Sequence, residues 1–144
     1  MTRFGPLLAV AVGGMVGSLA RWAVVGLADD SQELVIVGLN VFGSLLVGGL
    51  LGQRDRLTDQ SYALLATGFA GGLTTFSDFA VTVAENLERG ALLSALANGL
   101  GTTAAAVVAA GVGFRLSKLA FIHLPVRRWR RSRARSSSRE RARR

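Results

Sequence analysis

The stretch from Thr67 to Phe79, TGFAGGLTTFSDF, places two adjacent glycines and two adjacent threonines within a mostly apolar segment. Glycine and β-branched threonine are poor residues for a helix interior. We therefore predict that a helix breaks near Gly72 and Thr74. Unwound backbone at membrane depth is tolerated only where it is buried in protein or lines a cavity. Its carbonyls can bind cations and its amides can attract anions. The break is thus a candidate ion site, and the alternative is a flexible helix with solvated ends.

Apolar segments around this stretch predict an all-α integral membrane protein. A helix that crosses the ~30 Å hydrocarbon core needs about 20 mostly apolar residues. Four segments meet that length, at residues 4–28, 34–53, 61–84 and 91–122. Arg3 before the first segment also fits a secretory signal peptide. Three further spans favour a first transmembrane helix instead.

The composition argues against an enzyme and against a metal centre built from side chains. The chain has 144 residues, half of them apolar, with no cysteine and a single histidine, His123. A disulfide framework, a thiolate metal site and a cysteine nucleophile are thereby excluded. One histidine cannot form a metal site or a serine-type triad alone. We therefore expect a protein that is not an enzyme.

Positive charge is concentrated at one end of the chain. Residues 127–144 contain ten arginines and one glutamate, whereas residues 1–126 contain seven basic and eight acidic residues. We expect residues 1–126 to form a transmembrane domain of four helices. Residues 127–144 lack apolar periodicity, so we expect a disordered basic tail.

The loops show the same charge bias and indicate an orientation. Arg3, Arg54 and Arg56 lie on the side of the membrane that the tail occupies. The opposite side carries an acidic first loop and Arg89, which Glu88 offsets. The positive-inside rule then predicts a multi-pass protein of the cell membrane with both termini in the cytoplasm.

Several side chains are candidates for an ion path. Phe76 and Phe79 are three residues apart, so they share a helix face and could present electropositive ring edges to an anion. The alternative for this pair is a lipid-facing or core position. Asn40 lies in the middle of the second span, where its amide needs either a partner on another helix or a pore. Arg21 could snorkel, form a pair, or place a positive charge at a vestibule. Asp78 differs from both rings in helical position, so we expect it to face water or a partner.

Three motifs resemble those of the CrcB/Fluc family of fluoride channels. They are GGMVGSLARW at residues 13–22, NVFGS at 40–44 and GFAGGLTTFSDF at 68–79. They occur in the order that the family shows. The resemblance implies a fluoride-selective channel that passively exports fluoride and so lowers its cytoplasmic level. It also implies an antiparallel dual-pore dimer of four-helix subunits with a broken third helix.

The resemblance implies roles for individual residues. Fluoride is small and strongly hydrated, so a selective pore must replace its water with neutral donors. The implied pore residues are Asn40, Thr75, Phe76, Ser77, Phe79 and Thr102, with Arg21 at a vestibule. The backbone carbonyls of Gly71 and Thr74 would hold a structural Na⁺ at the dimer interface.

Two positions depart from the family pattern. The family often has Gly-Thr before its second motif, where this chain has Val35 and Ile36. Its fourth helix usually carries a tyrosine followed four residues later by a serine. Asn98 and Thr102 are the nearest match here.

An antiparallel homodimer conflicts with the one-sided charge distribution, because each copy would have to insert both ways. We therefore predict a dimer with an oppositely oriented paralogous subunit in preference to a dimer of this chain with itself. A small multidrug exporter is an alternative, but it needs a carboxylate in the first span and residues 4–28 contain none. A membrane scaffold with a lipid-binding basic tail is another. We do not expect nucleic-acid binding, because Trp129 is the tail's one aromatic residue.

Overall fold

The computed structural model describes residues 4–28 and 32–122, and this part of the chain is helical without strands. The basic tail, Arg3 and the acidic residues of the first loop lie outside the described residues. The elements are α1 (Phe4–Gly26), α2 (Gln32–Gly52), η2 (Arg54–Arg56), α3 (Asp59–Tyr62), η3 (Ala63–Ala70), α4 (Gly71–Leu73), α5 (Ser77–Glu88) and α6 (Leu92–Ile122). η2 is a turn of 3₁₀ helix and η3 is π-helical.

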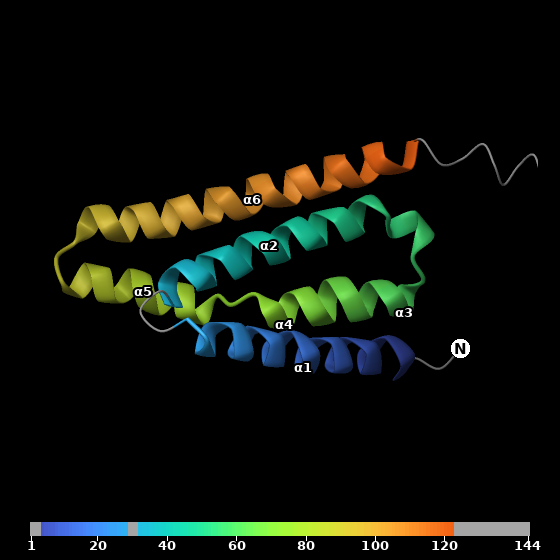
Figure 1. Cartoon of the computed structure of the whole chain (residues 1–144), viewed down its shortest axis with the longest axis horizontal. Helices are drawn as coiled ribbons and strands as arrows, with labels where there is room; N and C mark the ends of the chain where they lie inside the picture. Colours follow the sequence, from blue (N-terminus) through green and yellow to red (C-terminus); the bar gives the residue numbers. More distant parts are fainter. Residues whose placement is uncertain (1–3, 29–31, 123–144) are drawn as a thin grey trace, which may run out of the picture.

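Four helical spans in the described chain are long and apolar enough to cross a membrane, as predicted. They cover α1, α2, the third span from Asp59 to Glu88, and α6. The helix α1 ends at Gly26, two residues before the predicted end, and α2 begins at Gln32, two residues before the predicted start. In Figure 1, α1 and the third span run in one direction, and α2 and α6 run in the other.

The helices α2 and α6 lie side by side at very short range (Figure 1). A methyl group added to Gly48 would overlap the carbonyl oxygen of Ala110, and one added to Gly113 would overlap that of Leu45. Small residues allow such backbone approach, which substitutes for the hydrophobic driving force that lipid does not supply. Glycine therefore sets the spacing of this helix pair.

The helix α1 packs in the same way against the first half of the third span. Methyl groups at Gly13 and Gly17 would overlap the carbonyl oxygens of Leu64 and Phe69. The four-residue spacing of these glycines puts both on one face of α1. The π-helical η3 and α4 are held against that face, which fixes where the third span stops being helical.

The third span is interrupted between Leu73 and Ser77. Helical structure ends at Leu73, and Thr74 adopts an extended conformation with φ −82° and ψ 156°. The helix resumes as α5 at Ser77. The two threonines thus leave the helix where the sequence is least suited to it.

The large apolar side chains lie on the outside of this bundle. Among the described residues, five of the six buried apolar side chains are alanines: Ala28, Ala66, Ala70, Ala95 and Ala109. The sixth is Leu73. Exposed large apolar side chains occur on every span of the described chain. Such a surface suits lipid or a second subunit, and the close contacts within the chain are made by backbone.

Candidate functional site

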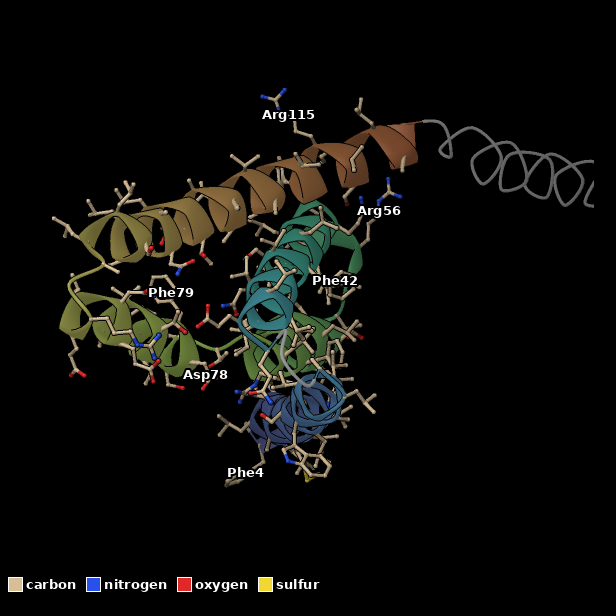
Figure 2. All side chains as sticks on the ribbon, turned by 60° about the vertical axis from the view of Figure 1, so that its left-hand side comes forward. Phe4, Phe42, Arg56, Asp78, Phe79 and Arg115 are labelled. Carbon is tan, nitrogen blue, oxygen red and sulfur yellow. The ribbon has the colours of Figure 1, made fainter. Side chains whose placement is uncertain are left out.

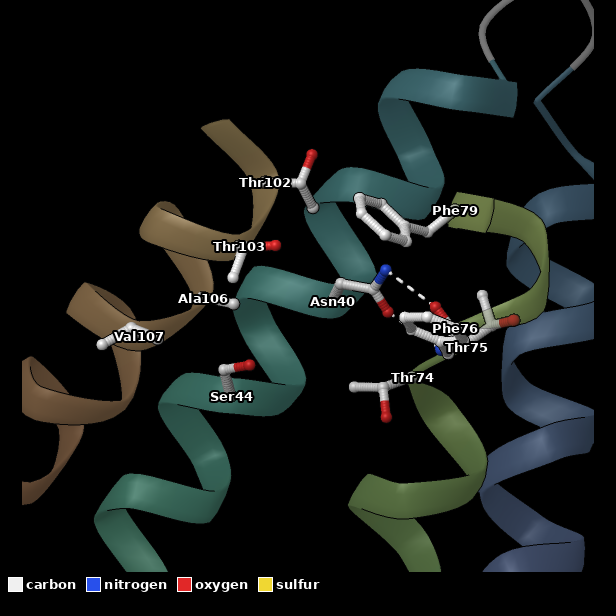
Figure 3. Close-up of a pocket in the computed structure, with 10 residues that line it drawn as sticks. All are labelled: Asn40, Ser44, Thr74, Thr75, Phe76, Phe79, Thr102, Thr103, Ala106 and Val107. Atoms are coloured by element: carbon white, nitrogen blue, oxygen red, sulfur yellow. Dashed lines mark hydrogen bonds between the residues drawn. The ribbon is translucent and has the colours of Figure 1, made fainter. Parts of the chain in front are cut away.

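The extended segment at the break is held by a side chain from α2. Asn40 Nδ2 donates a hydrogen bond to the Thr75 carbonyl at 3.0 Å, and Thr75 N donates to Asn40 Oδ1 at 2.9 Å (Figure 3). The carboxamide therefore satisfies both backbone groups of Thr75, which no longer take part in a helix. The Asn40 amide thus has a hydrogen-bond partner in the third span, one of the two situations expected for it.

A cavity of about 360 Å³ lies beside this pairing (Figure 3). It is lined by Asn40, Ser44, Thr74, Thr75, Phe76, Phe79, Thr102, Thr103, Ala106 and Val107. Residues from α2, the break, α5 and α6 thus meet at one place. No residue in this lining carries a formal charge.

Two aromatic rings stand at the cavity. The centroids of Phe76 and Phe79 are 5.6 Å apart and their planes are inclined by 44°. Phe76 is 78% exposed on the described chain, whereas Phe79 is half-buried. Figure 3 shows the Phe79 ring extending from α5 toward α2, with Phe76 next to Thr75. Inclined rings of this kind can turn electropositive edges toward an anion.

The α6 wall supplies hydroxyl groups at two neighbouring positions. Thr102 is buried, with 8% of its surface exposed. Thr103 donates its hydroxyl to the Gly99 carbonyl at 2.8 Å, so this proton is already used within the helix. Thr102 is therefore the α6 hydroxyl better placed to serve a bound ion.

A second cavity, of about 20 Å³, adjoins the first. It is lined by Glu33, Ile36, Val37, Asn40, Phe79, Thr82, Asn98 and Thr102. Asn40, Phe79 and Thr102 line both cavities. The two together extend along α2, α5 and α6 toward the N-terminal end of α2, where Glu33 is the charged residue in the lining.

Five of the six pore residues implied by the sequence line these cavities, and Ser77 does not. The Ser77 hydroxyl is 3.1 Å from the Thr75 hydroxyl, outside both linings. Asn98, matched to the fourth helix by spacing, lines the second cavity.

Four polar lining residues were missed from the sequence: Ser44, Glu33, Thr82 and Thr103. Ser44 is four residues after Asn40 and Thr82 is three after Phe79, so helical spacing would have put them on the same faces. Glu33 is seven residues before Asn40 and follows the same rule.

Arg21 lies outside both linings and binds at the break. Its Nη1 is 3.1 Å from Asp78 Oδ2, and its Nε donates to the Gly72 carbonyl at 3.3 Å. Asp78 thus has a partner, one of the two situations expected for it. A vestibule role for Arg21 stays a prediction.

The carbonyl of Gly71, just before the break, lacks its ordinary helical partner. The amide of Thr75 would bond to the Gly71 carbonyl in a continuous helix, but it donates to Asn40 instead. The Gly71 oxygen receives a long contact of 3.5 Å from Thr74 Oγ1. Gly71 is exposed, with open space around its Cα. Unwound carbonyls of this kind suit Na⁺. Within the described residues, no cluster of three or more His, Asp, Glu or Cys side chains offers a metal site.

The sequence model of one protein family, described as "CrcB-like protein, Camphor Resistance (CrcB)", matches residues 8–114. The chain belongs to this CrcB family. All three motifs and both cavities fall within the matched residues.

Curated relatives of this CrcB chain carry informative names. It is 40% identical over 109 residues to "Fluoride-specific ion channel FluC 2" of Natronomonas pharaonis, covering 76% of this chain and 91% of that protein. It is 37% identical over 113 residues to a protein of the same name from Rhodococcus jostii, covering 77% and 97%. It is 38% identical over 116 residues to "Fluoride-specific ion channel FluC" of Serratia proteamaculans, covering 76% and 91%.

Proposed function

We propose that this protein is a subunit of a passive, fluoride-selective channel that lowers cytoplasmic fluoride. The observation that carries the proposal is the uncharged cavity at the break, where two phenylalanine rings, a carboxamide and threonine hydroxyls meet. The names of the curated relatives give the ion. A passive conduit needs no reacting group, and the proposal assigns no enzymatic activity.

Selectivity follows from replacing the water around fluoride with weak donors. Asn40 commits one amide proton to Thr75, and its second can point toward the cavity. Thr102 supplies a hydroxyl, and Phe76 and Phe79 supply ring edges. A lysine or arginine would hold the anion too strongly for rapid conduction, and the cavity linings in the described chain contain neither. Fluoride would pass between the two cavities at Thr102 and Phe79.

The exposed ring of Phe76 supports assembly with a second subunit. A cavity lined on one side by a ring that is 78% exposed is open in the single chain. A second subunit in the opposite orientation would close it and would create two pores. The chain's one-sided charge supports a paralogous partner, because an antiparallel pair needs both orientations.

Positive charge supports a cytoplasmic location for both termini. Arg54, Arg56, Arg115 and Lys118 lie at the same end of the described bundle, and Glu33 and Glu88 lie at the other. Figure 2 shows Arg56 and Arg115 toward the C-terminal end of α6. Arg115 and Lys118 lie where anionic headgroups would be.

We also propose a structural Na⁺ on the carbonyls of Gly71 and Thr74. The support is the missing helical partner of the Gly71 carbonyl and the extended conformation of Thr74. The ion would bind the carbonyl oxygens of Gly71 and Thr74, which would hold it between subunits.

Fluoride efflux from proteoliposomes, measured with a fluoride electrode, tests the proposal. We expect rapid efflux with chloride excluded, and slow efflux for the double variant Phe76→Ile with Phe79→Ile. Phe42→Ile is the matched control, since Phe42 is exposed on α2 and outside both cavities. If the chain alone is inactive, co-reconstitution with an oppositely oriented paralogue should restore efflux. Absence of fluoride efflux from both preparations, each folded, contradicts the proposed function.

A further inference from the structure

We propose that Arg21 and Asp78 form a positioning pair that holds the two halves of the third span in register and neutralises a carboxylate beside the fluoride path. The inference rests on the proposed channel function. It concerns residues that line neither cavity.

One side chain from α1 contacts both sides of the break. Arg21 Nε donates to the carbonyl of Gly72, which precedes the break, at 3.3 Å. Arg21 Nη1 binds Asp78 Oδ2, which follows the break, at 3.1 Å. The guanidinium fork is suited to such a double contact, which a single ammonium group reproduces poorly.

The Gly72 carbonyl needs this donor because the helix ends one residue later. In a continuous helix it would accept from the amide of Phe76, but the chain is extended at Thr74. Ser18 Oγ also donates to the Gly72 carbonyl, at 3.4 Å. Two side chains of α1 therefore replace the helical partner that the break removes.

Asp78 lies in the first turn of α5, where a carboxylate is favoured by the helix dipole. Its next neighbour along the chain, Phe79, lines both cavities. Figure 2 shows Asp78 on the side of α5 toward α1, and Phe79 on the side toward α6. An unpaired carboxylate here would repel an anion in the cavity across the width of one helix.

Arg21 cancels that charge in a partly shielded place. The exposed fractions of the two side chains are 29% for Arg21 and 42% for Asp78. Solvent screens this pair less than it screens a fully exposed one. The pair therefore sets both the geometry of α5 and the net charge felt at Phe79.

A double-mutant cycle tests the inference with R21Q, D78N and the double variant R21Q/D78N, each reconstituted as the conducting assembly. Two quantities are measured: the fluoride efflux rate per active liposome and the fraction of liposomes that are active. The fraction of active liposomes reports how much protein is folded and assembled. The efflux rate per active liposome reports the effect of a variant on the fluoride path. We expect R21Q to slow the rate and R21Q/D78N to recover at least about tenfold of that loss. A purely structural pair would change the active fraction and leave the rate alone.

The second ion pair on α5 gives the matched control. Glu85 and Arg89 are 3.1 Å apart at i,i+4 spacing, and neither residue lines either cavity. R89Q and E85Q should leave the rate unchanged. If R21Q does not assemble, R21Q/D78N should restore assembly and rate. Losses that simply add in the double variant, or a double variant as impaired as R21Q, overturn the inference. A wild-type assembly that does not conduct overturns the proposed function instead.

Discussion

Asn40 and Thr75 exchange two hydrogen bonds, at 2.9 and 3.0 Å, between the side chain of one residue and the backbone of the other. The contact resembles the pairing of two strands, with a carboxamide in place of one strand. It also keeps the Thr75 amide away from the Gly71 carbonyl, its partner in a continuous helix. Asn40 thus stabilises the break and frees a carbonyl at the same time.

Replacing Asn40 should therefore destabilise the break and slow conduction. Asn40→Ala removes both partners of Thr75, and each buried backbone group left unpaired costs about 1–3 kcal/mol. We expect fluoride efflux to fall on the order of tenfold or more. Asn86→Ala is the control, because Asn86 bonds to the Thr82 carbonyl within α5 and lines neither cavity. Equal efflux from the two variants would contradict this role.

The two neighbouring threonines of α6 should differ in their effect on conduction. Thr102→Val keeps the shape but removes a hydroxyl whose bond to an anion is worth about 1.5–3 kcal/mol. We expect at least about tenfold slower efflux. Thr103→Val should change efflux little, since the Thr103 hydroxyl already bonds to the Gly99 carbonyl. Fluoride efflux measured with an electrode, with parallel chloride measurements, checks both variants. A larger loss of efflux for Thr103→Val would exclude Thr102 as the hydroxyl that serves the ion.

Sodium should raise the thermal stability of the assembled protein. A ligand that binds the native state shifts the unfolding midpoint upward with its concentration. We expect a higher Tm in Na⁺ than in choline at equal ionic strength. Asn40→Ala should weaken this dependence, because the Thr75 amide could then return to the Gly71 carbonyl. A Tm that is the same in both salts argues against a sodium site.

Glycines at the α2–α6 contact should tolerate substitution by alanine far less well than glycines elsewhere on α6. Gly48→Ala and Gly113→Ala would press a methyl group onto a backbone carbonyl. Overpacking of this kind costs about 1–3 kcal/mol or more. Gly111→Ala is the matched control, since a methyl group there meets nothing within 4 Å. Thermal unfolding in detergent measures the difference, and similar midpoints would show that the helices separate easily.

Labelling of single cysteines should reveal one orientation. The chain has no cysteine, so Asp55→Cys and Glu88→Cys each create a unique site at opposite ends of the bundle. Acidic residues contribute little to orientation, so neither change should alter it. We expect an impermeant reagent outside the cell to modify the cysteine at position 88 and not that at 55. Labelling of both in intact cells would indicate dual insertion and favour a homodimer.

Much of the fold could be predicted from local sequence. Hydropathy identifies the spans, because a segment that crosses the lipid must be apolar over a minimum length and must satisfy its backbone groups within the protein. Asn40 could be selected as a site candidate because an amide is unusual in the middle of a span. Phe76 and Phe79 could be selected because they follow the predicted break and share a helix face. Gly13 and Gly17 have the four-residue spacing that favours close helix contact in lipid, and both lie against backbone of the third span.

Contacts between distant residues could not be predicted in the same way. Arg21 and Asp78 are 57 residues apart in sequence, and three outcomes for Arg21 were open until α1 was placed against the break. The different roles proposed for Thr102 and Thr103 depend on how α6 is rotated about its axis, because adjacent residues of a helix lie on different faces. Ser77 was included with its neighbours, but the start of α5 puts it outside both cavities.

The length of α6 has a consequence for the surrounding bilayer. Its 31 residues span about 46 Å at 1.5 Å per residue, whereas the 21 residues of α2 span about 31 Å. The shorter helix matches an average hydrocarbon core, and the longer one continues past it to Arg115 and Lys118. The extra apolar turns of α6 can span a thicker hydrocarbon core. The apolar length of α2 would be too short for that core. Hydrophobic mismatch will therefore differ between two helices that are packed closely through glycine. A change in bilayer thickness will favour sliding of α2 and α6 along each other at their contact.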